Sequence, residues 1–142
     1  MRVVVDTSVL VSALLWGGLP HRVLELAEAK AITMCATENT LAELRDVLSR
    51  PKFHARLLAR GSTLEAVMQD VLSMVELYPH VPHPGSVPDD PDDEIFISCA
   101  VIADAFYLIT GDGHLLDLGQ VNNTRILAVR SFLDREFPNL AS

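Results

Sequence analysis

The sequence predicts an α/β domain in which a parallel sheet carries helices on both faces. The chain opens on an apolar run, VVV, whose lack of alternation is typical of a strand buried on both sides. Short apolar runs of this kind then alternate with longer segments in which apolar residues recur at helical spacing. The 142 residues suffice for one domain with a proper core, and we expect a single domain over residues 1–142 with a short tail from about residue 138.

The first part of the chain is expected to form two strands and two helices. Residues 2–6 are the first strand, and the apolar residues 8–16 are a helix that stops at Gly17-Gly18. Pro20 lies near the start of the next helix, where proline is tolerated. Residues 32–36 then form the second strand.

Three helices should follow. Thr37 can cap a helix that runs to about residue 49, and Pro51 ends it. A second helical piece covers about 52–59. A third begins at Ser62, with Glu65 at the capping-box spacing, and its apolar stripe runs through residue 75.

The last part of the chain begins with a proline-rich stretch, YPHVPHPGSVP, which we interpret as a loop because too little chain follows it for a second domain. Beyond it we expect a helix over about 91–104 and a strand over 106–110. A turn at 111–113, a strand over 125–129 and a last helix to about residue 136 complete the pattern.

The charge of the chain is unevenly distributed. A net charge of −8 speaks against binding to nucleic acid, which usually needs a basic face. However, five of the eleven basic residues fall between positions 45 and 60, where only one acid stands. These residues are Arg45, Arg50, Lys52, Arg56 and Arg60.

The cysteines and the N-terminal sequence indicate the cellular compartment in which we expect the protein. Cys35 and Cys99 lie far apart in apolar sequence without a metal-binding spacing, so we expect buried free thiols in a reducing compartment. The apolar N-terminus contains Asp6 and matches a signal peptide poorly, and no apolar stretch is long enough to span a bilayer. These features favour a cytoplasmic protein.

Two acids follow predicted strands directly. Asp6 comes after VVV, and Asp112 comes after YLIT by way of Gly111. Because parallel strands end at the same edge of a sheet, where sites form, both are candidates for one site. An acid in such a position is more often a turn former or a helix cap, so both interpretations remain open.

A dense acidic run, PDDPDDE, spans the start of another predicted helix. Asp90 is a good N-cap, Pro91 fits the first helical position, and acids in the first turn gain about 0.3–1 kcal/mol each from the helix dipole. Capping explains two or three of the five acids at 89–94, but not all of them. A divalent cation would turn their repulsion into binding energy, and hard oxygen ligands suit Mg²⁺ or Mn²⁺. The five histidines show no paired zinc spacing.

Four motifs resemble the PIN domain, the nuclease fold of VapC-type toxins, in family order over most of the chain: VVVDTSVLVSALL, ENTLAELRDVLSRPKF, DPDDEIFISCAV and YLITGDGHLL. The resemblance implies a three-layer α/β/α fold around a central, mainly parallel sheet of four to five strands. It also implies a metal-dependent endoribonuclease that uses Mg²⁺ or Mn²⁺.

The resemblance assigns the residues of this site. The four catalytic and metal-binding acids are Asp6, Glu43, Asp93 and Asp112, with Asp6 the best candidate for a direct ligand and Glu43 acting through water or orienting the nucleophile. Ser8, Thr110 and Asp92 are expected to support them. His114 stands where many relatives have an acid, so a fifth acid is missing here.

The implied partners are RNA, a small cognate antitoxin and a second copy of the chain, with no membrane. The basic residues Arg50, Lys52, Arg56 and Arg60 are candidates for phosphate contacts, although a solvated charged surface explains them equally well. Two alternatives remain open: a non-catalytic PIN-like module that binds RNA or protein, in which the acids serve only as caps, and a stand-alone RNA-processing nuclease.

Overall fold

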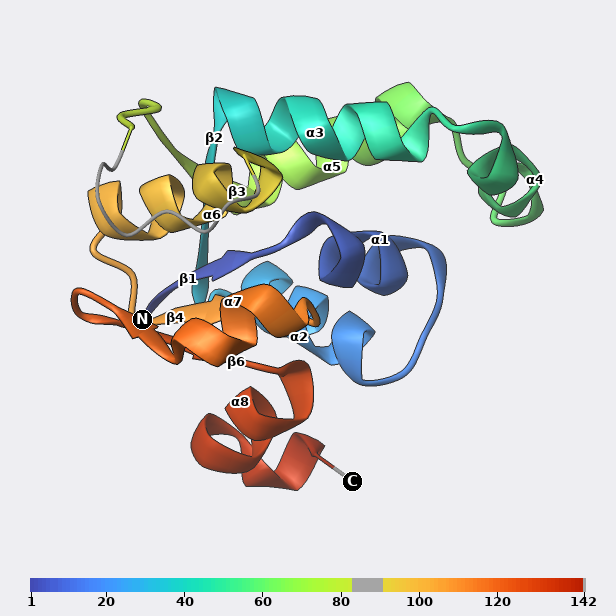
Figure 1. Ribbon diagram of the computed structural model, residues 1–142. Helices are drawn as coiled ribbons and strands as arrows, with labels where there is room; N and C mark the ends of the chain where they lie inside the picture. The colour runs from blue at the N-terminus through green and yellow to red at the C-terminus, as the bar shows by residue number, and fades with distance from the viewer. Residues whose placement is uncertain (83–90, 142) are drawn as a thin grey trace.

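A six-stranded sheet forms the centre of the computed structural model, which describes residues 1–82 and 91–141 (Figure 1). Its strand order is β3-β2-β1-β4-β6-β5, and every neighbouring pair is parallel except β5 with β6. The strands are β1 Arg2–Val5, β2 Thr33–Thr37, β3 Val75–Tyr78, β4 Tyr107–Ile109, β5 Gln120–Val121 and β6 Thr124–Leu127. The expected mainly parallel sheet is therefore confirmed, with one strand more than the upper estimate.

Helices cover both faces of this sheet. Val3 and Val5 belong to one buried cluster with α1 (Thr7–Leu15), α2 (Leu19–Glu28), α5 (Leu64–Met74) and α8 (Val129–Glu136). Val4, between them, points to the other face and packs with α6 (Pro91–Ile102) and α7 (Gly113–Leu118). Successive side chains of a strand point to opposite faces, so a strand apolar at every position is the one that needs cover on both sides. The three-layer prediction is confirmed.

Helix α3 (Glu38–Leu48) leaves the carboxyl end of β2 and packs against α1. Thr37 caps it as expected, and a reciprocal bond from Thr40 completes a capping box. Figure 1 shows α3 beside α5, with α4 (Pro51–Ala59) beyond their end. This arrangement brings the middle of α3 over the start of α1, where the sheet ends.

The structure corrects the boundaries of the predicted helix at 62–75. Its N-cap is Thr63 rather than Ser62, since the Thr63 hydroxyl accepts a hydrogen bond from the Ala66 amide at 3.1 Å. It also ends at Met74, because Val75 pairs with Met34 of β2 and starts an edge strand. Pairing with a distant strand outweighs the helical spacing of the apolar residues here.

Two elements near the C-terminus were not expected. Helix α7 follows the predicted turn at Gly111–Gly113, and β5 forms a short hairpin with β6. The hairpin turns at Asn122, whose φ is 50°, a conformation that asparagine tolerates better than most residues. After α8, residues Pro138–Leu140 form a 3₁₀ turn, and Ala141 is buried against the core.

Some expectations lie outside the described residues. The proposed cap Asp90, its neighbour Asp89 and the side chain of Asp92 are among them. Cys35 and Cys99 are buried and unbridged, as expected. Among the described residues no single helix is both long and apolar enough to cross a membrane, although α1 and α2, bent by 87° at their break, pass the same criteria of length and composition as a pair.

Candidate active site

A cleft of about 510 Å³ opens at the carboxyl edge of the sheet. Side chains from α1, α3, α4, α6 and the segment after β4 line it. Its acidic lining residues are the four that the resemblance selects, namely Asp6, Glu43, Asp93 and Asp112. The structure thus brings together acids that lie up to 106 positions apart in the sequence.

Asp6 stands at the end of β1 and caps α1. Its amide donates to the Ile109 carbonyl at 3.0 Å, which continues the β1–β4 ladder and fixes the backbone. Its Oδ1 accepts from the Val9 amide at 2.9 Å and the Ser8 hydroxyl at 3.2 Å, and its Oδ2 accepts from the Thr110 hydroxyl. Two donors therefore meet Oδ1 and a third meets Oδ2, so the carboxylate is held in one orientation at the edge of the sheet.

Burial decides the protonation behaviour of Asp6. The residue is only 5 % exposed, and burial raises the pKa of its carboxyl although hydrogen bonds from Thr110, Val9 and Ser8 act in the opposite direction. The raised pKa means that the ionised form is held at a cost in the metal-free protein. A cation bound in the cleft would offset that cost.

Thr110 connects Asp6 to Asp112. It is fully buried at the end of β4, and its amide donates to the Leu127 carbonyl at 3.0 Å. Its hydroxyl donates to Asp6 and accepts from the Asp112 amide at 3.0 Å. Asp112 in turn caps α7 by accepting from the His114 amide at 2.8 Å. One hydroxyl therefore positions both acids.

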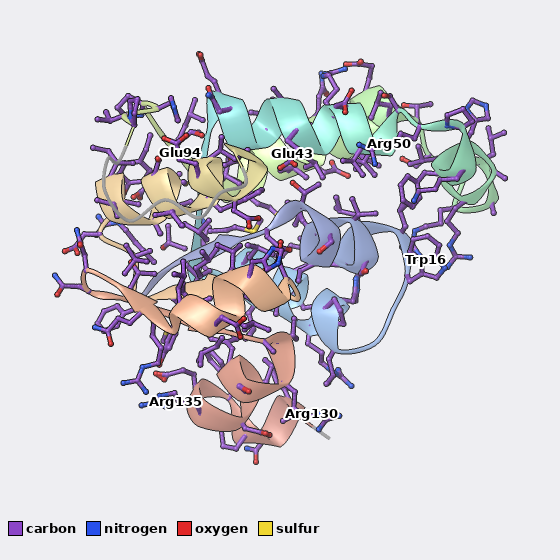
Figure 2. All side chains as sticks on the ribbon, in the orientation of Figure 1. Trp16, Glu43, Arg50, Glu94, Arg130 and Arg135 are labelled. Atoms are coloured by element: carbon purple, nitrogen blue, oxygen red, sulfur yellow. The ribbon has the colours of Figure 1, made fainter. Side chains whose placement is uncertain are left out.

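Glu43 enters the cleft from α3, on the side that faces α1 (Figure 2). The Thr7 hydroxyl donates to its Oε2 at 2.8 Å. Thr7 is itself buried in the first turn of α1, next to Asp6. The contact holds a flexible glutamate in a fixed position beside the first aspartate.

Asp93, Asp112 and His114 form the tightest group of potential metal ligands among the described residues. One ligand atom from each lies within 4.8 Å of the others. Asp93 sits in the first turn of α6 and is 5 % exposed, whereas the side chain of His114 is 79 % exposed. Asp6 and Glu43 line the same cleft but do not belong to this group. Carboxylates with an imidazole fit a divalent ion such as Mn²⁺ better than Mg²⁺, which prefers oxygen throughout.

The basic stretch divides into two parts. Arg50 and Lys52 line the cleft. Arg56 and Arg60 do not: they donate to the Leu15 carbonyl at 2.7 and 3.5 Å and so tie α4 to the end of α1. Of the four basic residues named as candidates for phosphate contacts, only Arg50 and Lys52 therefore lie in the cleft.

The lining residues that were not selected from the sequence include Thr7, Trp16 and Phe53. Thr7 had a signal, since it stands between Asp6 and Ser8 in the first motif. Trp16 and Phe53 had none, because they are 37 positions apart and meet only where α4 folds back onto α1.

Comparisons with known proteins agree with this architecture. A model of the PIN domain family matches residues 2–114. A similar fold occurs in the crystal structure of VapBC2 from Rickettsia felis bound to a DNA fragment from its promoter, with a TM-score of 0.59 and 18 % identity, covering 89 % of this chain and 97 % of that chain. At that identity the likeness shows the fold alone. A search of curated proteins found no match.

Proposed function

The chain belongs to the PIN domain family, and from that premise we propose that it is a divalent-metal-dependent endoribonuclease that hydrolyses RNA phosphodiester bonds. PIN domains are generally nucleases. The observation that carries the proposal for this chain is that four carboxylates and two cationic side chains line the same cleft. An acid cluster that served only as helix caps would not need a common cavity.

We assign the metal to Asp93 and Asp112, with His114 beside them and Asp6 completing the site from the end of β1. The ion would be Mg²⁺ or Mn²⁺; when bound, such an ion lowers the pKa of a coordinated water and neutralises charge on the phosphate. Thr110 and Ser8 hold Asp6 in position for this role through their hydroxyl groups. Supporting hydrogen bonds of this kind typically change metal affinity by about 10–100-fold.

Glu43 is proposed to orient the attacking water or to accept its proton. Its carboxylate is held by Thr7 from one side, which leaves the residue at a fixed place beside Asp6. A general base must lie within hydrogen-bond reach of the proton that it removes, and fixing a long side chain lowers the entropy cost of that arrangement.

Arg50 and Lys52 are proposed to contact the RNA backbone. They stand in the same cleft as the acids, so a phosphate held by them would lie next to the carboxylates. Arg56 and Arg60 contribute indirectly, by fixing α4 against α1. This division of roles explains how a chain with a net charge of −8 can take a polyanion.

We further propose that the protein is the toxin of a type II toxin-antitoxin pair, inhibited by a small antitoxin, forming a homodimer and acting in the cytoplasm. Support comes from the resemblance to VapC-type toxins and from the fold shared with a chain of VapBC2. A short neighbouring open reading frame whose product copurifies with this chain is the expected result. Its absence would favour a stand-alone RNA-processing nuclease.

The test of the nuclease is cleavage of total RNA by the wild-type chain with Mg²⁺, with Mn²⁺ and with EDTA, beside Asp93→Asn. We expect metal-stimulated cleavage by the wild type and at least a hundredfold loss in the variant, whose melting temperature is measured to establish that it folds. No metal-stimulated cleavage on several RNAs, or equal cleavage by a folded Asp93→Asn protein, would overturn the proposal.

A further inference from the structure

One wall of the cleft is formed by an exposed aromatic ring. Trp16 follows α1 directly, lines the same cleft as the acids, and is 43 % exposed. Figure 2 shows it at the end of α1, beside α4. It is the only tryptophan of the chain. A large ring left partly open to solvent inside a cleft has apolar surface available for a ligand.

The ring is held firmly from the side of α4. The Phe53 ring meets Trp16 edge to face, with centroids 6.1 Å apart and planes at 71°. The Arg56 guanidinium lies 5.3 Å from the Trp16 centroid while its Nε donates to the Leu15 carbonyl at 2.7 Å. Because the neighbouring groups are themselves fixed, the indole is positioned before any ligand arrives.

Cations accompany these rings on the cleft wall. Lys52 Nζ lies 5.0 Å from the Phe53 centroid, and both Lys52 and Arg50 line the cleft with Trp16. Arg50 forms an ion pair with Asp46 at 3.6 Å, and because both side chains are exposed this contact is weak. Aromatic rings beside cations are what a strand of alternating bases and phosphates needs, whereas an apolar peptide would use the rings alone.

We propose that Trp16 is a base-stacking residue that holds an unpaired nucleotide of the substrate next to the phosphate bound by Lys52 and Arg50. This inference rests on the proposed function for the identity of the polymer and adds one specific contact to it, in which an unpaired base of the RNA lies against the indole of Trp16. A base inside a duplex has both faces covered by its neighbours and cannot stack on a side chain. Phe53 and Arg56 act as positioning residues for the indole.

The single tryptophan permits a direct test in the unmodified protein. Wild-type chain in EDTA and 50 mM salt is titrated with a ten-nucleotide single-stranded RNA, and the same RNA, end-labelled, is followed separately by fluorescence anisotropy. We expect saturable quenching of the tryptophan emission with the same dissociation constant as the anisotropy. The matching duplex should bind at least tenfold more weakly.

Variants separate stacking from general affinity. Trp16→Ala should weaken single-stranded RNA binding by about tenfold, a typical loss for removing one stacking ring, and Trp16→Phe should retain most of it. Phe106, 63 % exposed just before β4 and outside the cleft, provides the matched control, and Phe106→Ala should bind as the wild type does. Circular dichroism and the melting temperature establish that each variant folds.

The outcomes distinguish this inference from the nuclease proposal. Binding with unchanged tryptophan emission, together with wild-type affinity in Trp16→Ala, overturns stacking even if the protein cleaves RNA. Quenching by single-stranded RNA without metal-stimulated cleavage supports stacking and refutes the nuclease. Loss of a copurifying protein from Trp16→Ala at unchanged RNA affinity also overturns stacking, and assigns the ring to a protein partner.

Discussion

Replacing Asp6 by asparagine should separate two effects of the buried carboxylate: the stability that its charge costs the metal-free fold, and the proposed contribution of that charge to metal binding. The carboxyl is 5 % exposed and its pKa is raised by burial, so its ionised form destabilises the metal-free fold. Asparagine caps helices about as well as aspartate and can keep the bond from the Val9 amide. We therefore expect metal-free Asp6→Asn at neutral pH to melt at or above the temperature of the wild type.

The difference in stability between metal-free Asp6→Asn and the wild type should increase with pH. A folded-state pKa above the unfolded value of about 3.9 means that the folded state binds more protons than the unfolded state in the intervening range. The contribution of Asp6 to stability is then fully present below about pH 3.9 and is lost as pH rises through the folded pKa. The advantage of Asp6→Asn should accordingly grow from acid to neutral pH.

With Mn²⁺ present, the wild type should instead melt at a higher temperature than Asp6→Asn. At a Mn²⁺ concentration 100 times its dissociation constant, binding stabilises the wild type by about 2.7 kcal/mol, or roughly 8–11 °C for a chain of this size. If the substitution weakens binding by about 100-fold, the same concentration yields only about 0.4 kcal/mol, or roughly 1–2 °C. Differential scanning calorimetry with and without Mn²⁺ measures both effects.

The matched control is Asp70→Asn, an exposed aspartate on α5 outside the cleft, which should respond to Mn²⁺ as the wild type does. Two results would refute the reasoning. One is a Mn²⁺-induced rise in Asp6→Asn equal to that of the wild type. The other is a metal-free variant that melts more than about 3 °C below the wild type, since that would make the ionised carboxylate a net stabiliser.

Other substitutions test the neighbouring contacts and the core. Thr110→Val removes the hydroxyl that joins Asp6 to Asp112 and should weaken Mn²⁺ binding by about 10–100-fold in calorimetric titrations. Thr110→Ser keeps a hydroxyl and should bind Mn²⁺ as the wild type does. Equal Mn²⁺ affinities of Thr110→Val and the wild type would exclude the positioning role. His114→Asp should lower the ratio of Mn²⁺ to Mg²⁺ affinity by about tenfold, because an oxygen replaces a nitrogen donor, and an unchanged ratio would remove His114 from the site. Burial raises the pKa of Cys35 to about 11 and that of Cys99 to about 12, so the folded state keeps protons that the unfolded state loses. The free energy of unfolding in urea should therefore fall above about pH 8.5, and by less in C35A/C99A than in the wild type, whereas parallel curves would contradict the shift.

The centre of the sheet was predictable because an uninterrupted run of apolar residues indicates a strand that is buried on both faces. VVV is apolar at every position, and the structure covers both of its faces. Strand β3 was not predictable in this way: its residues continue the apolar spacing of α5, and only the pairing of Val75 with Met34 of β2 makes them a strand. Helix α7 was missed for a related reason, since its six residues are too few for a helical period to be recognised.

The motifs selected four acids that the structure places in one cleft, but the surroundings of these acids were not predictable. The sequence shows that Asp6 and Asp112 each follow a strand, and this position predicted that both lie at the same edge of the sheet. The role of Thr110 in joining them depends on which of its neighbours its hydroxyl reaches, which spacing does not fix. The separation of Arg50 and Lys52 from Arg56 and Arg60 required the packing of α4 on α1.

The two interpretations of the acids, helix caps or site residues, turn out not to exclude each other. Asp6 and Asp112 each accept a capping hydrogen bond from a helix N-terminus, and Asp93 lies in the first turn of α6. Capping bonds of this kind and the positive end of a helix stabilise a carboxylate by about 0.3–1 kcal/mol or more each, with no cation present. Glu43 lies in the middle of α3 and lacks that support, and the Thr7 hydroxyl serves it instead. Local structure thus offsets part of the repulsion among the four carboxylates in the cleft, and it fixes their positions without the help of a cation.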